Sequence, residues 1–259
     1  MNAGPNASPS DDARVCYVLR LADTSLILGQ RLSEWIGHAP ALEEDLGLAN
    51  ISLDLIGQAR LLLSYAGELE GRGRSEDELA FGRDAGEFRN LSLVEQPNGN
   101  FGRTLVKQLL VSAFQLELYT KLESSTDARL AEIAAKSVKE TRYHFRYSAS
   151  WVVRLGDGTE ESHARVQSAL NDLWPFTEEL FATDSIDELA AAAGAAPRAA
   201  HLKAAWLART DAVLTEATLV RPSDSIFPWH GKRGVHTEHL GYLLAEMQFL
   251  QRAYPGAQW

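Results

Sequence analysis

The chain has 259 residues, of which 45% are hydrophobic, so it can bury a sizeable core as one large domain or two small ones. Its 25 Lys and Arg residues stand against 35 Asp and Glu residues, a net charge of -10, and no basic run is long enough to follow a phosphate backbone, which argues against nucleic acid as a partner. The single cysteine, Cys16, cannot form an internal disulfide or a Cys-based zinc or iron-sulfur centre, and it suits a reducing cytoplasm.

The first residues are polar, with Asn, Pro and Ser where a signal peptide has an apolar core. We therefore expect residues 1–12 to form a disordered tail and residues 13–259 to form one helical domain. No stretch reaches the roughly 18 apolar residues that a membrane span needs. We expect a cytoplasmic protein that makes no membrane contact.

Helical periodicity between Gly- and Pro-containing breaks predicts four long helices, at residues 11–36, 41–69, 101–123 and 127–155. Helices of about 25 residues build a bundle about 35 Å long. The connection between the second and third of them is long, and a ferritin-like bundle has its one crossover there. Further helices are expected at residues 160–181, 198–219 and 237–253. The predicted fold is all-α: a ferritin-like four-helix bundle with additional C-terminal helices.

The second predicted helix carries apolar residues on two sides. One stripe comprises Leu42, Leu46, Ala49, Leu53 and Ile56. The other stripe comprises Leu48, Ile51, Leu55 and Leu62. A helix that is apolar on two sides is expected to be buried on two sides.

Two sequence quartets come close to a di-iron motif: Asp54-Leu55-Ile56-Gly57 on the second helix and Glu140-Thr141-Arg142-Tyr143 on the fourth. A di-iron carboxylate bundle has Glu-x-x-His at both places, because residues three apart project from one helix face onto the same metal pair. Each quartet here keeps an acid and lacks the histidine. The sequence therefore predicts a bundle on the oxygenase plan that has lost its metal site, with no catalytic residue.

The other ligand positions leave one metal alternative open. The first helix offers Asp23-Thr24-Ser25 without a Glu, and Glu117 is the inward-facing candidate on the third helix. His144 lies four residues after Glu140, so a mononuclear site formed by Glu117, Glu140 and His144 is the alternative to an empty bundle. The simpler interpretation is that the polar pair left inside the bundle is satisfied by hydrogen bonds.

Two motifs near the C-terminus imitate binding sites. His236-Thr237-Glu238-His239 has imidazoles three residues apart as in a zinc site, but Thr237 is also a suitable helix N-cap, and we favour the cap. Gly231-Lys232-Arg233-Gly234 lacks the spacing of a phosphate-binding loop and is interpreted as a solvated turn. No nucleophile-elbow, Cys-based or Rossmann signature is present.

Four longer blocks carry a family resemblance: QRLSEWIGHAP at 30–40, LDLIGQAR at 53–60, VEQPNGNF at 94–101 and HTEHLG at 236–241. They resemble the C subunits of bacterial phenylacetyl-CoA 1,2-epoxidase, the ring-oxygenating complex of aerobic phenylacetate breakdown. The resemblance runs from about residue 15 to the last residue. The tail before it is longer than is usual in that family.

The resemblance implies a structural, non-catalytic subunit. In that family the A subunit is a ferritin-like di-iron protein that binds phenylacetyl-CoA and inserts one oxygen atom of O2 into the ring. A reductase subunit with FAD and a 2Fe-2S centre supplies electrons from NADPH. The C subunit lacks iron, pairs with the A subunit, keeps it soluble and correctly shaped, and helps to form the acyl-CoA pocket. The alternatives are a metal-binding ferritin-like oxygenase active in its own right and a plain ferritin-like binding or storage protein.

One segment of the crossover is a candidate for contact with substrate. Phe88, Arg89 and Asn90 offer an aromatic face, a guanidinium group and a carboxamide in succession. A CoA thioester presents phosphates, an adenine and an amide arm, which such groups can bind. We predict that these three residues contact the CoA portion; an ordinary helix-capping loop is the alternative.

Overall fold

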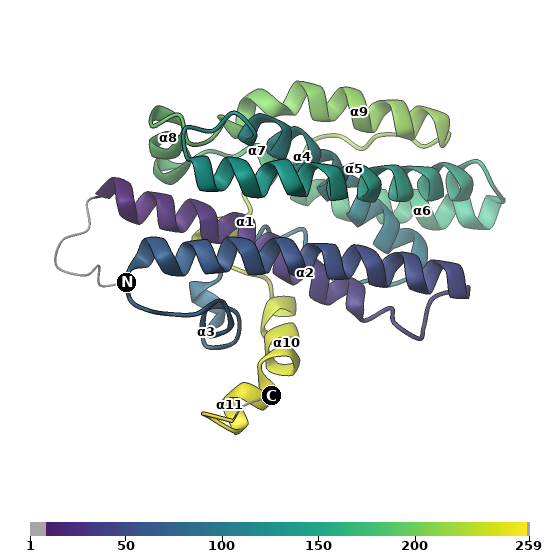
Figure 1. Cartoon of the computed structure of the whole chain (residues 1–259). Helices are drawn as coiled ribbons and strands as arrows, with labels where there is room; N and C mark the ends of the chain where they lie inside the picture. Colours follow the sequence, from purple (N-terminus) through teal and green to yellow (C-terminus); the bar gives the residue numbers. More distant parts are fainter. Residues whose placement is uncertain (1–8, 258–259) are drawn as a thin grey trace.

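The computed structural model describes residues 9–257. Four long helices run side by side (Figure 1): α1 (Pro9–Ser33), α2 (Leu42–Glu70), α4 (Phe101–Leu122) and α5 (Ala128–Gly156). α1 packs mainly against α2, and α4 packs mainly against α5. Within the described range the chain forms no strand, only an isolated bridge between His230 and Val235. The predicted all-α four-helix bundle is confirmed.

Local sequence explains where the long helices begin and end. Asn100 precedes α4, and its side-chain oxygen accepts a hydrogen bond from the Arg103 N–H at 2.9 Å. Asp127 caps α5 in the same way. Gly71 ends α2 with φ at 67°, a left-handed conformation that glycine adopts without steric cost. The observed ends therefore lie close to the predicted ones.

The N-terminal boundary differs from the expected one. Residues 1–8 of the expected tail lie outside the described residues. Residues 9–12 belong to the first turn of α1, which begins at Pro9. Proline is favourable at a first helical position, because the N–H that it lacks would have no partner there. From α1 to α10 the buried apolar residues form one core cluster.

The crossover between α2 and α4 is mostly exposed in its first half and buried in its second half. It contains the short helices α3 (Glu76–Phe81) and η1 (Ala85–Glu87). Ser75 and Glu78 begin α3 with a reciprocal capping box. The residues that follow are packed into the core, among them Leu91, Leu93 and Val94. The crossover thus forms part of the hydrophobic core.

Lys107 of α4 holds the end of the crossover from inside the core. The residue is fully buried, and its Nζ donates to the Gln96 carbonyl at 2.6 Å and to the Asn98 side-chain oxygen at 3.2 Å. In the described residues no carboxylate forms an ion pair with it. Burial, with a smaller effect of the Arg31 charge, lowers the pKa of Lys107 to about 7.

This pKa predicts a pH dependence of stability. Unfolded lysine has a pKa of about 10.4, so between that value and about 7 the unfolded chain binds a proton that the folded chain does not. We expect the Lys107 contribution to the free energy of unfolding to rise from pH 7 to pH 9 by about 1 kcal/mol per pH unit. Chemical unfolding of wild type and Lys107→Met across this range measures it. Lys121→Met, at an exposed site near the end of the same helix, is the control. The prediction would be contradicted if the difference in the free energy of unfolding between wild type and Lys107→Met did not change with pH.

The C-terminal part of the chain packs further helices around the bundle, with more breaks than expected. It comprises α6 (Glu160–Leu173), η2 (Trp174–Phe176), α7 (Glu178–Phe181), α8 (Ser185–Ala192), η3 (Ala199–Leu202), α9 (Lys203–Glu216), η4 (Gly231–Arg233), α10 (Glu238–Met247) and α11 (Phe249–Ala253). The helix expected at 160–181 is interrupted at Pro175, which has no N–H to continue the α-helical hydrogen bonding, and a 3-10 turn takes its place. The helix expected at 237–253 is divided at Gln248.

The expectation that α2 is buried on two sides is wrong for this chain alone. The stripe of Leu48, Ile51, Leu55 and Leu62 is fully buried. In the other stripe, Leu42, Leu46 and Leu53 are 72%, 57% and 66% exposed. The core of one bundle therefore covers only one of the two apolar sides of α2.

The apolar character of α2 also bears on the membrane expectation. By length and composition α2 is a helix that could cross a membrane, contrary to the sequence-based expectation, and half of its most apolar window is buried inside the fold. Core helices of proteins in water meet the same criterion. α2 is therefore weak support for a membrane span.

Candidate functional site

The two quartets that resemble a di-iron motif meet at a seam between α2 and α5. His144 Nε2 of α5 lies 3.0 Å from an Asp54 carboxylate oxygen of α2. Gln58 Nε2, one turn further along α2, donates to Glu140 Oε2 at 2.9 Å. The helices are antiparallel, because the higher-numbered residue of α2 faces the lower-numbered residue of α5. The sequence placed the two acids on the second and fourth helices, and the structure shows that these helices are neighbours and that each acid contacts a side chain of the other helix.

The hydrogen bonds at the seam are of the kind that hold two helices together. The His144 ring is fully buried, and its second nitrogen, Nδ1, has no hydrogen-bond partner among the described residues. Glu140 lies 3.9 Å from the exposed Lys136 ammonium group, so a cation on its own helix accompanies its amide partner. The hydrogen-bond interpretation of this polar pair agrees with these distances.

The remaining candidate metal ligands lie elsewhere. Glu117 Oε1 accepts from Arg209 of α9, from Nε at 2.9 Å and from Nη2 at 2.5 Å. Asp23 of α1 pairs with Arg83 of the crossover. The alternative mononuclear site is therefore not assembled, because Glu117 is paired with Arg209 and forms no ligand group with Glu140 and His144. Residues 9–257 contain no group of three or more His, Cys, Asp or Glu side chains that could hold a metal ion.

Several other polar side chains lie inside the bundle, but they are not the carboxylates and imidazoles that a di-iron centre requires. Gln58, Gln108, Gln115 and Thr141 are buried, and each has at least one polar atom without a protein partner in the described part of the chain. Amides and a hydroxyl cannot replace the about four carboxylates and two imidazoles that a di-iron centre requires. The donor set therefore does not fit a di-iron cofactor.

The His236–His239 motif also has a structural role. His236 Nδ1 lies 3.0 Å from Glu95 Oε2, and its Nε2 lies 3.0 Å from the Phe88 carbonyl oxygen, so protein groups occupy both ring nitrogens. Thr237 is the N-cap residue of α10, as predicted, but its hydroxyl makes no capping hydrogen bond. Its N–H donates to Glu95 Oε1 at 2.7 Å instead.

The turn at residues 231–234 is anchored, contrary to the expected solvated turn. A Cβ on Gly231 would lie 2.4 Å from the Asn90 carbonyl oxygen, so only glycine allows this approach to the crossover. Lys232 Nζ donates to Asp187 at 3.1 Å, and the Lys232 N–H donates to Glu179 at 3.0 Å. The turn thus joins the crossover to the helices after α6.

The predicted substrate-binding residues are mostly inward-facing. Phe88 is fully buried under the Arg83 guanidinium group, whose carbon lies 4.3 Å from the ring centroid. Asn90 is also fully buried, and its amide donates to the Leu91 carbonyl at 3.1 Å and to Glu95 at 3.2 Å. These two side chains are not presented to a ligand in this conformation.

Arg89 is the member of this trio that is partly exposed. Its Nη1 donates to the carbonyls of Gly86 and Phe88, both at 2.7 Å, and its N–H donates to Asp23 at 2.8 Å. Partial burial lowers the pKa of its guanidinium group. Contact with CoA stays a prediction for residues 88–90, and Arg89 is the residue of the three whose side chain is accessible to a ligand.

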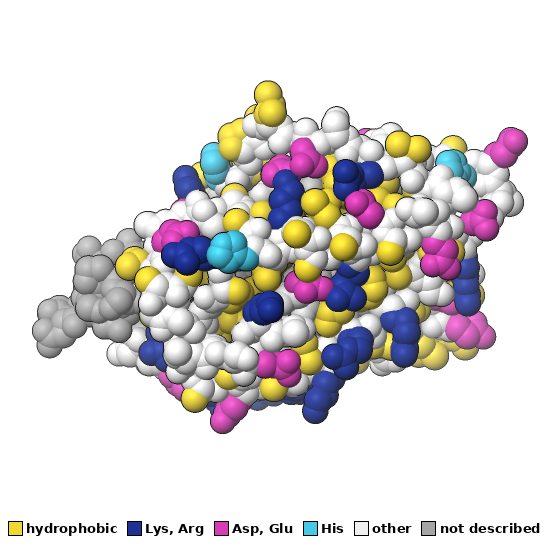
Figure 2. Space-filling view, turned by 90° about the horizontal axis from the view of Figure 1, so that it is seen from above, with side chains coloured by type: hydrophobic (Ala, Val, Ile, Leu, Met, Phe, Trp, Pro, Cys, Tyr) yellow, Lys and Arg dark blue, Asp and Glu magenta, His cyan; other side chains and the backbone are white. Residues whose placement is uncertain are grey.

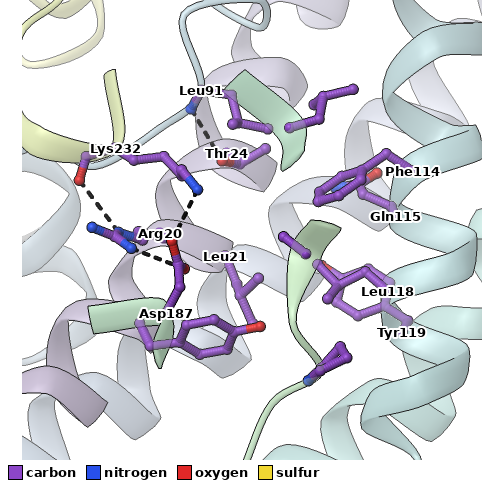
Figure 3. A pocket seen from close by; sticks show the side chains of 14 residues that line it. Arg20, Leu21, Thr24, Leu91, Phe114, Gln115, Leu118, Tyr119, Asp187 and Lys232 are labelled. Carbon is purple, nitrogen blue, oxygen red and sulfur yellow. Dashed lines mark hydrogen bonds and ion pairs between the residues drawn. The ribbon is translucent and has the colours of Figure 1, made fainter. Parts of the chain in front are cut away.

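A small cavity lies between α1, α4 and the C-terminal helices (Figure 3). Arg20 and Asp187 form an ion pair of 2.9 Å on one side, and Leu21 and Phe114 contribute apolar walls. Its volume is about 50 Å³, and ligand pockets of drug-sized molecules need about 300 Å³ or more. The cavity therefore suits a few water molecules rather than an acyl-CoA.

A larger cleft was not anticipated from the sequence. It has a volume of about 470 Å³, and its walls include Phe181, Lys203, Phe227, Trp229 and Arg233. These residues come from α7, α9 and the extended segment before α10, and no local pattern connects segments so far apart. None of the predicted substrate-binding residues lines it.

Comparison with known proteins gives concordant results. The family model described as phenylacetic acid catabolic protein matches residues 3–259. The C subunit of the 1,2-phenylacetyl-CoA epoxidase of Escherichia coli (strain K12) is 54% identical over 243 residues, which cover 94% of this chain and 98% of that protein. The family match includes the α2–α5 seam, the crossover and the C-terminal helices.

Proposed function

The chain belongs to the family of phenylacetic acid catabolic proteins, and we propose that it is the structural, non-catalytic subunit of a phenylacetyl-CoA 1,2-epoxidase complex. In this role it pairs with the di-iron catalytic A subunit in the cytoplasm and keeps that subunit soluble. The A subunit supplies the iron, and a reductase subunit with FAD and a 2Fe-2S centre supplies electrons from NADPH.

One observation carries this proposal. At the α2–α5 seam, where the bundle plan of a di-iron protein puts its Glu-x-x-His motifs, His144 is bonded to Asp54 and Gln58 is bonded to Glu140. Glu117, the candidate acid of α4, is held by Arg209. In a catalytic protein of the same fold, the side chains at these positions would bind metal. Here they form contacts between helices instead, and this observation favours a structural role in the complex.

Coexpression with the catalytic A subunit tests the proposal. We expect a stable complex that epoxidises phenylacetyl-CoA when the reductase is added, and an A subunit that aggregates or loses activity when it is expressed alone. The chain without its partner should self-associate, because the second apolar side of α2 is then uncovered. A fully active, soluble A subunit in the absence of this chain would contradict the structural role.

Iron content separates this proposal from an oxygenase active in its own right. We expect the purified chain to bind less than stoichiometric iron, because neither quartet contributes an imidazole at the required position. Metal analysis of wild type, Glu140→Ala and the exposed same-helix control Glu132→Ala measures it. About two irons per chain, lost in Glu140→Ala but kept in Glu132→Ala, would favour the oxygenase.

The shared acyl-CoA pocket is tested at Arg89. In the reconstituted complex, Arg89→Ala is expected to weaken phenylacetyl-CoA binding by about 1 to 3 kcal/mol, the loss of a charge-assisted hydrogen bond. The Michaelis constant should rise while the iron content and the intact complex stay unchanged. Arg89→Lys, which keeps the charge, and Arg198→Ala, at another exposed arginine, are the controls. An unchanged Michaelis constant in Arg89→Ala would remove this residue from the pocket.

A further inference from the structure

The second apolar side of α2 forms a continuous exposed row. Leu42, Leu46 and Leu53 are separated by four and seven residues, so they lie on one side of the helix. More than half of each side chain is accessible to solvent. Single exposed leucines are common, but a row of them marks an interaction site. The row is therefore a candidate contact surface.

α5 extends this surface laterally. α2 and α5 lie next to each other at the front of the bundle (Figure 1), and the seam bonds hold them in place. Tyr143 of α5 is 39% exposed and adds an aromatic side chain. A Cβ on Gly57 of α2 would meet no atom within 4 Å, so open space lies above the helix there. Each helix has 29 residues and is about 43 Å long.

Unpaired cations border the surface along α5. Lys139, Arg142 and Arg146 are exposed, and none of them forms an ion pair with a carboxylate of the described residues. Exposed arginines elsewhere do pair: Arg198 lies 3.1 Å from Glu188, and Arg221 lies 2.7 Å from Asp211. Figure 2, which views the molecule from above, shows Lys and Arg side chains gathered along one long edge. In a chain of net charge -10, such a row is locally unusual.

We define the α2–α5 face by Leu42, Leu46, Leu53, Tyr143, Lys139, Arg142 and Arg146. We propose that this face docks the partner subunit of the complex, and that the docking surface of that subunit is apolar opposite α2 and acidic opposite α5. This inference rests on the proposed function and names the surface through which it acts. Carboxylates on the partner would neutralise the three cations, and an apolar ridge would cover the leucine row.

Charge favours a different subunit over a second copy of this chain. A second copy would match leucine with leucine, but it would bring three more unpaired cations to the same contact. Like charges across an interface oppose association, whereas opposite charges accelerate and orient it. Subunits of permanent complexes bury about 2,000 Å² or more, and two adjacent helices of 29 residues each offer a long surface for such a contact.

The test measures the dissociation constant of the complex that is purified after coexpression of the full-length chain with the catalytic A subunit. Leu46→Glu with Leu53→Glu alters the apolar row, and Lys139→Glu with Arg146→Glu alters the charged border. Leu250→Glu on α11, which is 47% exposed, and Arg198→Glu are the matched controls. Because all these sites are exposed, circular dichroism should show unchanged helix content. We expect each pair on the face to weaken binding by more than about 100-fold, as truncation of interface hot spots does, and the controls to bind like wild type.

Salt dependence gives a second readout. Wild-type affinity should fall as salt concentration rises, and Lys139→Glu with Arg146→Glu should reverse or abolish that dependence. If wild type binds tightly and the face variants bind equally well, the docking surface lies elsewhere: the inference fails and the proposed function stands. If wild type does not bind the catalytic subunit, both fail. If a homodimer persists in the presence of an equimolar amount of the catalytic subunit, as seen by sedimentation, and is lost in Leu46→Glu with Leu53→Glu, a second copy is the occupant and the inference is overturned.

Discussion

Replacing Asp23 with alanine is expected to destabilise the chain by about 3 to 5 kcal/mol, the cost of leaving a buried charge without its partner. Asp23 is fully buried, and Arg83, its partner, is 2% exposed. Arg83 Nη1 donates to Asp23 Oδ2 at 3.0 Å, and the Arg89 N–H donates to the same oxygen at 2.8 Å. The carboxylate therefore joins α1 to the crossover at two points. Urea unfolding followed by circular dichroism measures the loss.

An exposed ion pair supplies the control for this variant. Asp172, 59% of whose side chain is accessible, lies 2.8 Å from Arg103, and Asp172→Ala should cost about 0 to 1 kcal/mol. The difference between the two losses of unfolding free energy measures how much the burial of the Asp23–Arg83 pair matters. If Asp23→Ala costs no more than Asp172→Ala, the carbonyls of Leu79 and Glu87 are sufficient to satisfy Arg83, and the pair does not stabilise the fold.

Glu95→Ala is expected to destabilise the chain by about 3 kcal/mol or more, because three polar groups lose their partner at once. The carboxylate is fully buried, accepts from Thr237 N at 2.7 Å and Asn90 Nδ2 at 3.2 Å, and lies 3.0 Å from His236 Nδ1. Two of these groups, those of His236 and Thr237, begin the segment that leads into α10. Hydrogen exchange should therefore show α10 opening before the four long helices do.

Two neighbouring variants sharpen this experiment. Glu238→Ala, at an exposed site in the first turn of α10, should cost only about 0.3 to 1 kcal/mol through the helix dipole. Glu95→Gln keeps the shape and one acceptor oxygen and should fall between the two. Equal exchange rates in α10 for wild type and Glu95→Ala would show that Glu95 does not hold the C-terminal segment.

The sequence predicted the helices better than it predicted their surroundings. Periodicity and punctuation located the four long helices and the crossover, because both signals are local. Burial of the second stripe of α2 was predicted wrongly, since periodicity identifies an apolar side without saying whether this chain or another one covers it. The partnership of Glu117 with Arg209 joins residues 92 positions apart. The inward placement of Phe88 and Asn90 likewise depends on contacts with α1 and the C-terminal segment, which no local pattern reveals.

The bond between the crossover and the C-terminal segment has a consequence for synthesis. Glu95 and His236 are 141 positions apart, and a ribosome that adds about 5 to 20 residues per second needs about 7 to 28 s to join them. During that interval the carboxylate has no His236 or Thr237 to bind, while the leucines of α2 are already outside the ribosome. The incomplete chain therefore exposes apolar surface and is prone to aggregate until its synthesis ends. Cells that make the partner subunit at the same time and place would limit aggregation at this stage.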